Sequence, residues 1–234
     1  MFVRVVDRDK EPLNTPIDSD DVCFPPKMSR ILKMIPVFNI IYGFWSENNI
    51  QLDTVFESLK NCDVILDHIH NVENQGKKYI NSCVVNNNEE LSVMPVIPLK
   101  ETLVLYKKYR DEAEIVLCES DLWCIKEYFC EFVRKSCYAE KQGRLGSVFL
   151  YENLGVAAMA GKNDVRNKYG TLCEVKIVEK RVLDRHDGRW LSDIRTTCLF
   201  KECFEAIKNY WEGKMTDNPK VEYLFSGKYT LKEL

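Results

Sequence analysis

Three histidines and several nearby carboxylates are the side chains of this chain that could hold a metal ion or move a proton. His68 and His70 lie close to Asp63 and Asp67. Residues two apart on a helix point to different faces, so we do not expect these histidines to share an ion. His186 lies in a polar run that we expect to be an exposed turn, with no catalytic pattern around it. The sequence therefore indicates neither a metal site nor a catalytic histidine.

Sequence motifs of the common enzyme classes are absent from the chain. There is no GxSxG, HExxH, GxGxxG or kinase-type signature. Acidic residues are plentiful and scattered. A hydrolase of nucleotides or RNA, built on two carboxylates that only the fold brings together, stays an alternative. We expect a protein without catalytic residues, cofactor or metal.

Basic residues give the stronger functional signal. Lys107, Lys108 and Arg110 alternate with Tyr106 and Tyr109, and other cations gather in a loop and around a turn further along. Exposed cations bind the phosphate backbone, and aromatic rings beside them can stack on bases. Acidic residues interleave with many of these cations, so ordinary solvated surface is the competing interpretation. The residues that we predict to bind RNA are Lys107, Lys108, Arg110, Lys162, Arg166, Lys168, Lys180, Arg181, Arg185 and Arg189.

The composition is that of a chain with a sizeable core. It has 234 residues, of which 45% are hydrophobic and 29% charged, and its formal net charge is −3. This length suits one large domain, or one domain with an extension. The ten cysteines include no CxxC pair, so we expect reduced, buried thiols in a cytoplasmic protein. The first residues lack a signal-peptide core and no apolar run is long enough to span a bilayer, so we expect no membrane partner.

Residues 169–204 are the stretch around which we expect the fold to be organised. Apolar residues alternate with charged ones over residues 173–179 and return over residues 190–194, which predicts two paired strands. Asp187-Gly188 between them is a strong hairpin signal, because glycine tolerates the positive φ angle of tight turns. The passage predicts a fold and carries no catalytic chemistry.

Other segments predict the remaining helices and strands. Apolar spacings of three to four residues predict helices over residues 53–69, capped by Asp53, from residue 120 or 121 to 133, and over residues 199–211, ended by Gly213. The prolines near residue 95 restrict that run to an edge or bulged strand. Residues 1–30 carry four prolines and predict an arm that orders against a partner, or a flexible tail. Short apolar runs predict strands over residues 34–45, 80–85, 93–105, 115–117, 145–151 and 154–160.

Four segments of residues 93–210 follow one another in an order that is also found in a known family. They are Met94-Pro95-Val96-Ile97-Pro98-Leu99, a helix over residues 121–135, Tyr169-Gly170-Thr171 with Glu174 and Val175, and Asp187-Gly188-Arg189-Trp190 with Asp193 and residues 195–200. In this order they resemble the amino-terminal substrate-binding domain of Lon proteases, the Lon-like domain shared with cereblon. The resemblance implies a PUA-like pseudobarrel used for binding, and relatives of that fold often bind RNA.

The chain departs from both of those proteins. It has no GxxxxGK[ST] phosphate loop for an ATPase, and it lacks the paired CxxC zinc ligands and the aromatic cage that follow the domain in cereblon. The resemblance therefore implies neither proteolysis nor the ligand recognition of cereblon. In overall organisation, the chain also resembles small Lon-like dormancy factors of microsporidian ribosomes.

These observations together predict an α+β fold, a mostly antiparallel PUA-like pseudobarrel with a few helices and an N-terminal extension. We expect an N-terminal arm and α/β extension over residues 1–92, a Lon-like barrel domain over residues 93–213 and a tail over residues 214–234. The predicted function is that of a non-enzymatic dormancy factor that docks on ribosomal RNA and ribosomal proteins and blocks a functional site. The alternative is a substrate adapter of a ubiquitin ligase or protease, with residues 200–211 as an interface helix.

Overall fold

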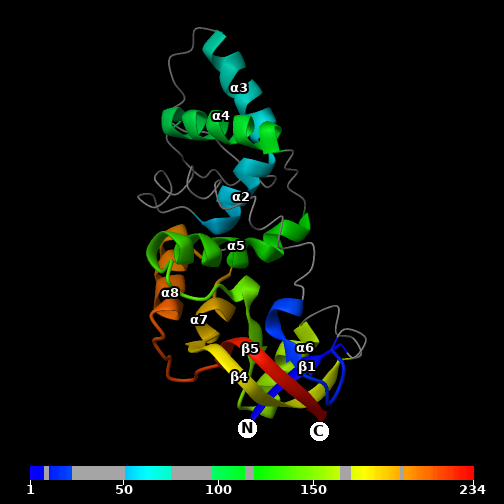
Figure 1. Ribbon diagram of the computed structural model, residues 1–234. Helices are drawn as coiled ribbons and strands as arrows, with labels where there is room; N and C mark the ends of the chain where they lie inside the picture. The colour runs from blue at the N-terminus through cyan, green and yellow to red at the C-terminus, as the bar shows by residue number, and fades with distance from the viewer. Residues whose placement is uncertain (8–10, 23–50, 75–95, 114–118, 164–169, 196–197) are drawn as a thin grey trace. The chain divides into compact units, whose positions relative to one another are not determined.

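The computed structural model describes residues 1–7, 11–22, 51–74, 96–113, 119–163, 170–195 and 198–234 (Figure 1). The chain divides into two compact units. The first, called the sheet unit, comprises Met1–Met28, Val133–Asp193 and Ala206–Leu234. The second, called the helical unit, comprises Ser29–Phe132 and Ile194–Glu205. Segments far apart in the sequence thus come together in each unit.

The sheet unit is built on an antiparallel sheet, and the chain as a whole has the α+β fold that its sequence predicts. The sheet has the strand order β1-β4-β5-β2, with β3 also paired to β5. Short helices lie before or after some of these strands in the chain. The strands are β1 (Phe2–Val6), β2 (Ile17–Asp18), β3 (Val148–Leu150), β4 (Thr171–Asp187) and β5 (Val221–Glu233). The helices are η1 (Ser19–Asp21), η2 (Arg144–Gly146), α6 (Leu154–Asn163) and α7 (Arg189–Ser192).

The sheet is curled, and its central strand β5 is paired on both sides. One side of β5 follows β4 along its length, from Cys173↔Glu233 to Asp187↔Val221. The other side pairs with β3 and then with β2. The backbones of Val3 and Tyr151 exchange two hydrogen bonds of 2.7 and 2.9 Å, which join the end of β3 to β1. This closure gives the sheet its half-barrel form.

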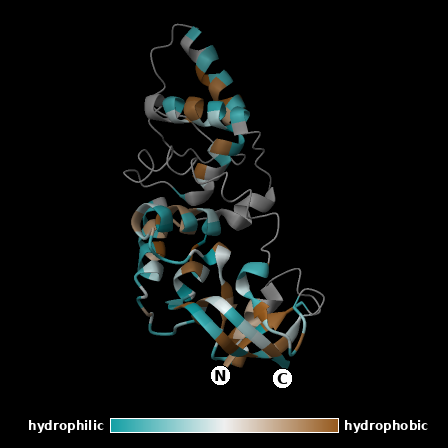
Figure 2. Ribbon diagram, viewed as in Figure 1, coloured by the Kyte–Doolittle hydropathy of each residue, from teal (hydrophilic) through white to brown (hydrophobic). Residues whose placement is uncertain are grey.

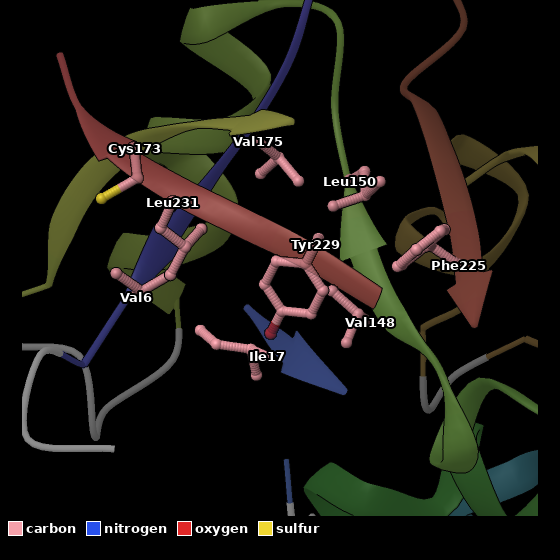
Figure 3. Packing of buried hydrophobic residues seen from close by; sticks show 9 residues of the cluster. All are labelled: Val6, Ile17, Val148, Leu150, Cys173, Val175, Phe225, Tyr229 and Leu231. Atoms are coloured by element: carbon pink, nitrogen blue, oxygen red, sulfur yellow. The ribbon is translucent and has the colours of Figure 1, made fainter. Parts of the chain in front are cut away.

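A hydrophobic cluster fills the inside of the curled sheet (Figure 3). Successive side chains of a strand point to opposite faces, so alternate residues of β4 and β5 reach the interior. Tyr229 and Leu231 of β5 lie between Cys173 and Val175 of β4 and residues of the other strands. Each fully buried side chain of this kind contributes about 1.5–3 kcal/mol to folding. The members of the cluster are Val6, Ile17, Val148, Leu150, Cys173, Val175, Phe225, Tyr229 and Leu231.

The helical unit contains amphipathic helices. It includes α2 (Leu52–Lys60), α3 (Cys62–Asn74) and α4 (Val96–Ala113). The long helices α5 (Glu119–Cys137) and α8 (Phe200–Trp211) each have one part in this unit and one part in the sheet unit. Hydrophobic and hydrophilic residues alternate around α3 (Figure 2). The buried hydrophobic side chains described in α2 and α3 are those with helical spacing, namely Val55, Leu59, Cys62, Ile65 and Ile69.

Three helix predictions are confirmed in their positions. Helices α2 and α3 cover the predicted residues 53–69, although Asn61 separates them and Asp53 lies inside α2, whose N-cap is Gln51. The prediction that Asp53 caps the helix is therefore wrong. Helix α5 covers the predicted residues 121–133. Helix α8 ends as predicted, because Gly213 adopts a φ of 72° and donates a 3.0 Å hydrogen bond to the Tyr210 carbonyl.

The predicted hairpin over residues 173–194 is wrong in its second half. After β4 ends at Asp187, the chain enters α7 and does not return as a strand. Gly188 has a φ of −64°, so no tight hairpin turn forms there. The Asp187 carboxylate instead accepts the backbone N–H of Arg189 at 2.8 Å, as a residue at a helix start does. The strand that pairs with β4 is β5, from the predicted tail over residues 214–234.

Three other local predictions are also corrected. Part of the predicted strand 93–105 belongs to helix α4, which places Pro98 in the first turn, where a missing N–H breaks no intrahelical bond. The run 154–160 belongs to helix α6, whereas β3 confirms a strand within 145–151. Residues 2–6, predicted as part of an irregular arm, form β1. The predicted strands 34–45, 80–85 and 115–117 lie outside the described residues.

Candidate functional site

Among the described strands, none pairs with one edge of β4 over more than half of its length. Strand β1 pairs only with Thr171–Val175, and no other described strand pairs with that edge. Beyond residue 175 several side chains of β4 are exposed, and Val178 is 57% exposed, whereas Ile177 and Leu183 pack against the hydrophobic cluster. The cations that are exposed along this stretch are Lys176, Lys180, Arg181 and Arg185, which we call the basic edge.

Carboxylates neutralise only part of the basic edge. Arg181 forms ion pairs with Asp18 and, at 3.1 Å, with Asp20. Beside it on the sheet, Glu179 is paired with Lys228 at 3.1 Å. Within the described residues no carboxylate lies within ion-pair distance of the three remaining cations, Lys176, Lys180 and Arg185.

The predicted cations of α4 are in a different environment. Lys107 and Arg110 both bind Asp63 of α3, and one Arg110 contact measures 2.7 Å. The hydrogen bond from Arg110, followed by that from Lys107, lowers the pKa of Asp63 to about 2. Lys108 is exposed. The predicted stacking role of Tyr106 is wrong, because its side chain is fully buried.

The other predicted RNA contacts do not join the basic edge. Arg189, in α7, donates to the Asn218 carbonyl at 3.2 Å and lies 3.8 Å from Asp193. Lys162 lies in α6, and its side chain is outside the described part of the chain, as are Arg166 and Lys168. The α4 cations belong to the helical unit, whereas the basic edge belongs to the sheet unit. The candidate site is therefore the basic edge alone.

A second polar cluster lies at the end of β4, and the sequence pattern did not reveal it. His186 was predicted in an exposed turn, but it is buried, with 1% of its surface exposed. Its Nδ1 lies 2.8 Å from the Tyr210 carbonyl, which can only accept, so this nitrogen carries the proton. Burial lowers the pKa of His186, so the imidazole is neutral at pH 7. Its ring stacks on that of Tyr210, with centroids 4.5 Å apart.

Arg144, Tyr210 and Glu222 complete this cluster. The Tyr210 hydroxyl donates to the Glu222 carboxylate at 2.7 Å, and Arg144 donates to the Tyr210 hydroxyl at 2.7 Å. Arg144 also pairs directly with Glu222. The three residues come from η2, α8 and β5, so no local spacing in the sequence could have grouped them. A substrate cannot reach them from solvent because Tyr210 and Glu222 are buried, and we assign them a structural role.

The described residues contain no cluster of side chains suited to bind a metal ion. No three His, Cys, Asp or Glu side chains lie close enough there to hold an ion. His68 and His70 are both exposed on α3.

Across the described ranges, none of the helices has both the length and the apolar character needed to cross a membrane.

Comparison with known proteins places the chain in a family. No curated protein matches it. The family model described as "Protein of unknown function (DUF2441)" matches residues 48–233, which is well over half of the 234 residues. This match includes β4 with its basic edge, and β5, which pairs with it. The chain belongs to the DUF2441 family.

Proposed function

We propose that this chain is a non-enzymatic RNA-binding protein that grips the phosphate backbone with its basic edge. The observation that carries the proposal is the exposure of Lys176, Lys180 and Arg185 along one open strand edge, without carboxylate partners among the described residues. A strand rises about 3.3 Å per residue, so residues 176–185 span roughly 30 Å. Cations spread over that length suit an extended polyanion better than a small anion.

The backbone of β4 favours a polyanion over an added β-strand. The pairing of β4 with β5 shifts its register between Ile177 and Glu179 and again between Lys180 and Val182. Bulges and edge lysines are features with which proteins discourage their open strands from pairing with another strand. The basic edge combines both features. Its cations remain able to contact phosphates, which requires no strand geometry.

We propose the ribosome as the particle that the protein binds, because ribosomes expose RNA backbone over a large surface. Binding would act sterically, by occupying a functional site and holding the particle idle. The resemblance to Lon-like dormancy factors supports this choice of particle. The sheet unit would carry the contact, since Lys176, Lys180 and Arg185 all lie on it.

Co-sedimentation with purified ribosomes over a series of salt concentrations tests the proposal. Each phosphate contact contributes about 0.7–0.9 to the slope of log affinity against log salt, so three cations predict a slope of about −2 to −3. In the double variant Lys180→Ala/Arg185→Ala, the slope of log affinity against log salt should become less negative by nearly two. The matched control is Lys201→Ala, which removes an exposed lysine of α8 outside the basic edge. Failure of the unaltered protein to sediment at low salt would refute ribosome binding.

The adapter alternative gains no support from α8, the helix predicted as its interface. Cys203, Ile207 and Trp211 are buried within the chain, so α8 does not offer these side chains to a partner. RNase treatment distinguishes the two hypotheses. If the chain binds RNA, RNase should abolish its co-purification with ribosomes. An adapter should keep its protein partners after RNase treatment.

A further inference from the structure

An acidic turn near the start of the chain contacts one cation of the basic edge. The turn consists of Asp18, which ends β2, and Ser19–Asp21, which form η1. Asp18 forms an ion pair with Nη2 of Arg181, and Asp20 forms one with its Nη1 at 3.1 Å. The same Nη2 donates to the Ser19 hydroxyl at 3.0 Å. Both terminal nitrogens of Arg181 thus have acceptors, and these come from a segment more than 160 positions away.

Contacts other than these ion pairs hold the acidic turn on the sheet. Ile17, which precedes it, pairs with β5 and belongs to the hydrophobic cluster. The Gly227 N–H donates to the Ser19 hydroxyl at 3.0 Å. The Asp20 N–H donates to the Asp18 side chain at 3.1 Å, an N-cap contact that asparagine makes equally well. The acidic turn should therefore keep its position when its carboxylates are replaced by amides.

The carboxylates of the acidic turn occupy the groups of Arg181 that would bind a phosphate. A guanidinium uses the same N–H groups for carboxylates and for phosphates, often two at a time. The Arg181 side chain is 37% exposed, so a phosphate can reach it once those carboxylates are neutral. Lys180 and Arg185, the neighbouring cations of the basic edge, lie on the same strand. Arg181 is thus suited to contact the RNA that these two cations bind.

We propose that the acidic turn is an autoinhibitory contact, in which Asp18 and Asp20 occupy Arg181 in place of an RNA phosphate and so weaken RNA binding. This inference rests on the proposed function, because it concerns the same basic edge. The turn belongs to the same chain, so its carboxylates compete at the high effective concentration of an intramolecular contact. Two carboxylates and a hydroxyl also satisfy Arg181 more completely than one phosphate does.

Replacing the two carboxylates by amides tests the proposal in the full chain. In Asp18→Asn/Asp20→Asn, Arg181 becomes available, and the protein should bind a fluorescently labelled oligouridylate more tightly. One added contact to a single-stranded phosphate backbone makes the slope of log affinity against log salt more negative by about 0.7. For a tenfold lower salt concentration, this change in slope corresponds to about a fivefold gain in affinity. An affinity and a slope equal to those of the unaltered protein would refute the proposal.

Two further variants show whether the gain comes from Arg181. The charge-matched control is Glu140→Gln/Asp217→Asn, which neutralises two exposed carboxylates outside the basic edge and should leave the slope unchanged. Adding Arg181→Ala to Asp18→Asn/Asp20→Asn should abolish the gain in affinity. A gain that persists without Arg181, or an equal gain in the control, would show that the loss of negative charge alone causes it, and would overturn the proposal.

The unaltered protein separates this inference from the proposed function. If it binds oligouridylate and Asp18→Asn/Asp20→Asn binds no better, the inference fails and RNA binding stands. If neither protein binds even at low salt, RNA binding by the basic edge fails, and the autoinhibitory contact fails with it. Binding by the double variant alone would support both.

Discussion

The hydroxyl of Tyr210 donates a 2.7 Å hydrogen bond to the carboxylate of Glu222, and both residues are buried. Arg144 binds both partners, so the tyrosine hydroxyl joins an arginine to a glutamate. The same arrangement recurs at Tyr229, whose hydroxyl donates to Glu11 at 2.6 Å and accepts from Arg4 at 3.2 Å. A buried charge pair is costly unless its remaining polar atoms are also satisfied, and the tyrosine hydroxyl satisfies some of them.

Replacing Tyr210 by Phe should therefore destabilise the protein. The change removes one donor from the buried Glu222 and one acceptor from Arg144, at a cost of about 1–3 kcal/mol. Chemical denaturation measures the free energy of unfolding. Tyr106→Phe is the matched control, because the buried Tyr106 hydroxyl has no hydrogen-bond partner among the described residues, so the loss should be smaller. Equal losses in the two variants would show that the cluster does not stabilise the fold.

Asp187→Asn should destabilise the protein more than the small change in side-chain shape suggests. The Asp187 carboxylate is fully buried and accepts hydrogen bonds from the Arg189, Lys220 and Thr216 backbones and from the Thr216 hydroxyl, at 2.7–2.8 Å. Asn replaces one accepting carboxylate oxygen by an NH2 group, which would face the N–H and O–H groups that now donate to Asp187. We therefore expect the free energy of unfolding to fall by about 2–4 kcal/mol. The exposed Asp217→Asn serves as the control in the same denaturation experiment. A loss below about 0.5 kcal/mol would contradict the anchoring role of Asp187.

His186 should make the stability of the protein depend on pH. Burial lowers the pKa of folded His186, whereas the unfolded chain binds a proton near the ordinary value of 6.5. The stability that neutral His186 provides is therefore complete above pH 6.5 and is lost as the pH falls from 6.5 towards the folded pKa. His186→Gln should reduce the slope of unfolding free energy against pH by up to about 1.4 kcal/mol per unit in that range. The exposed His68→Gln is the control, and a slope unchanged in His186→Gln would contradict the prediction.

Gly227 is a position where a side chain should not be tolerated. It has a φ of 145°, and an added Cβ would collide with the backbone carbonyl oxygen of Glu179 on β4. Backbone in the neighbouring strand cannot move as a side chain can, so Gly227→Ala should cost more than about 2 kcal/mol. The control is Gly146→Ala, where the nearest atom is the flexible Gln142 side chain at 3.3 Å. Thermal and chemical unfolding of both variants measure the difference, and equal stabilities would refute the prediction.

Helices α2, α3, α5 and α8 were predictable because their evidence is local, whereas α4 and α6 were mistaken for strands. The apolar spacing that predicts α5 and α8 lies within each helix, and Gly213 marks the end of α8 by its own conformational freedom. The same reasoning failed at Asp187-Gly188, since this dipeptide can begin a helix as well as a hairpin. Thr216 and Lys220, which lie far along the chain, donate hydrogen bonds to Asp187 and so stabilise the helix start.

The candidate site was only partly visible in the sequence. Lys180, Arg181 and Arg185 were recognised as cations, but the ion pairs of Arg181 with Asp18 and Asp20 join residues more than 160 positions apart. The buried cluster of Arg144, Tyr210 and Glu222 was missed for the same reason. Polar residues such as these look alike in a sequence whether they are exposed or buried.

The sequence by itself determined the helices over residues 53–69, 121–133 and 199–211, the α+β class of the fold and the type of each charged side chain. Only the tertiary structure decided that β5 pairs with β4, which part of β4 pairs with β1, and which described cations form ion pairs with carboxylates. The physical reason is that helical hydrogen bonds close within four residues, whereas strand pairs and ion pairs depend on groups that folding brings together from distant parts of the chain.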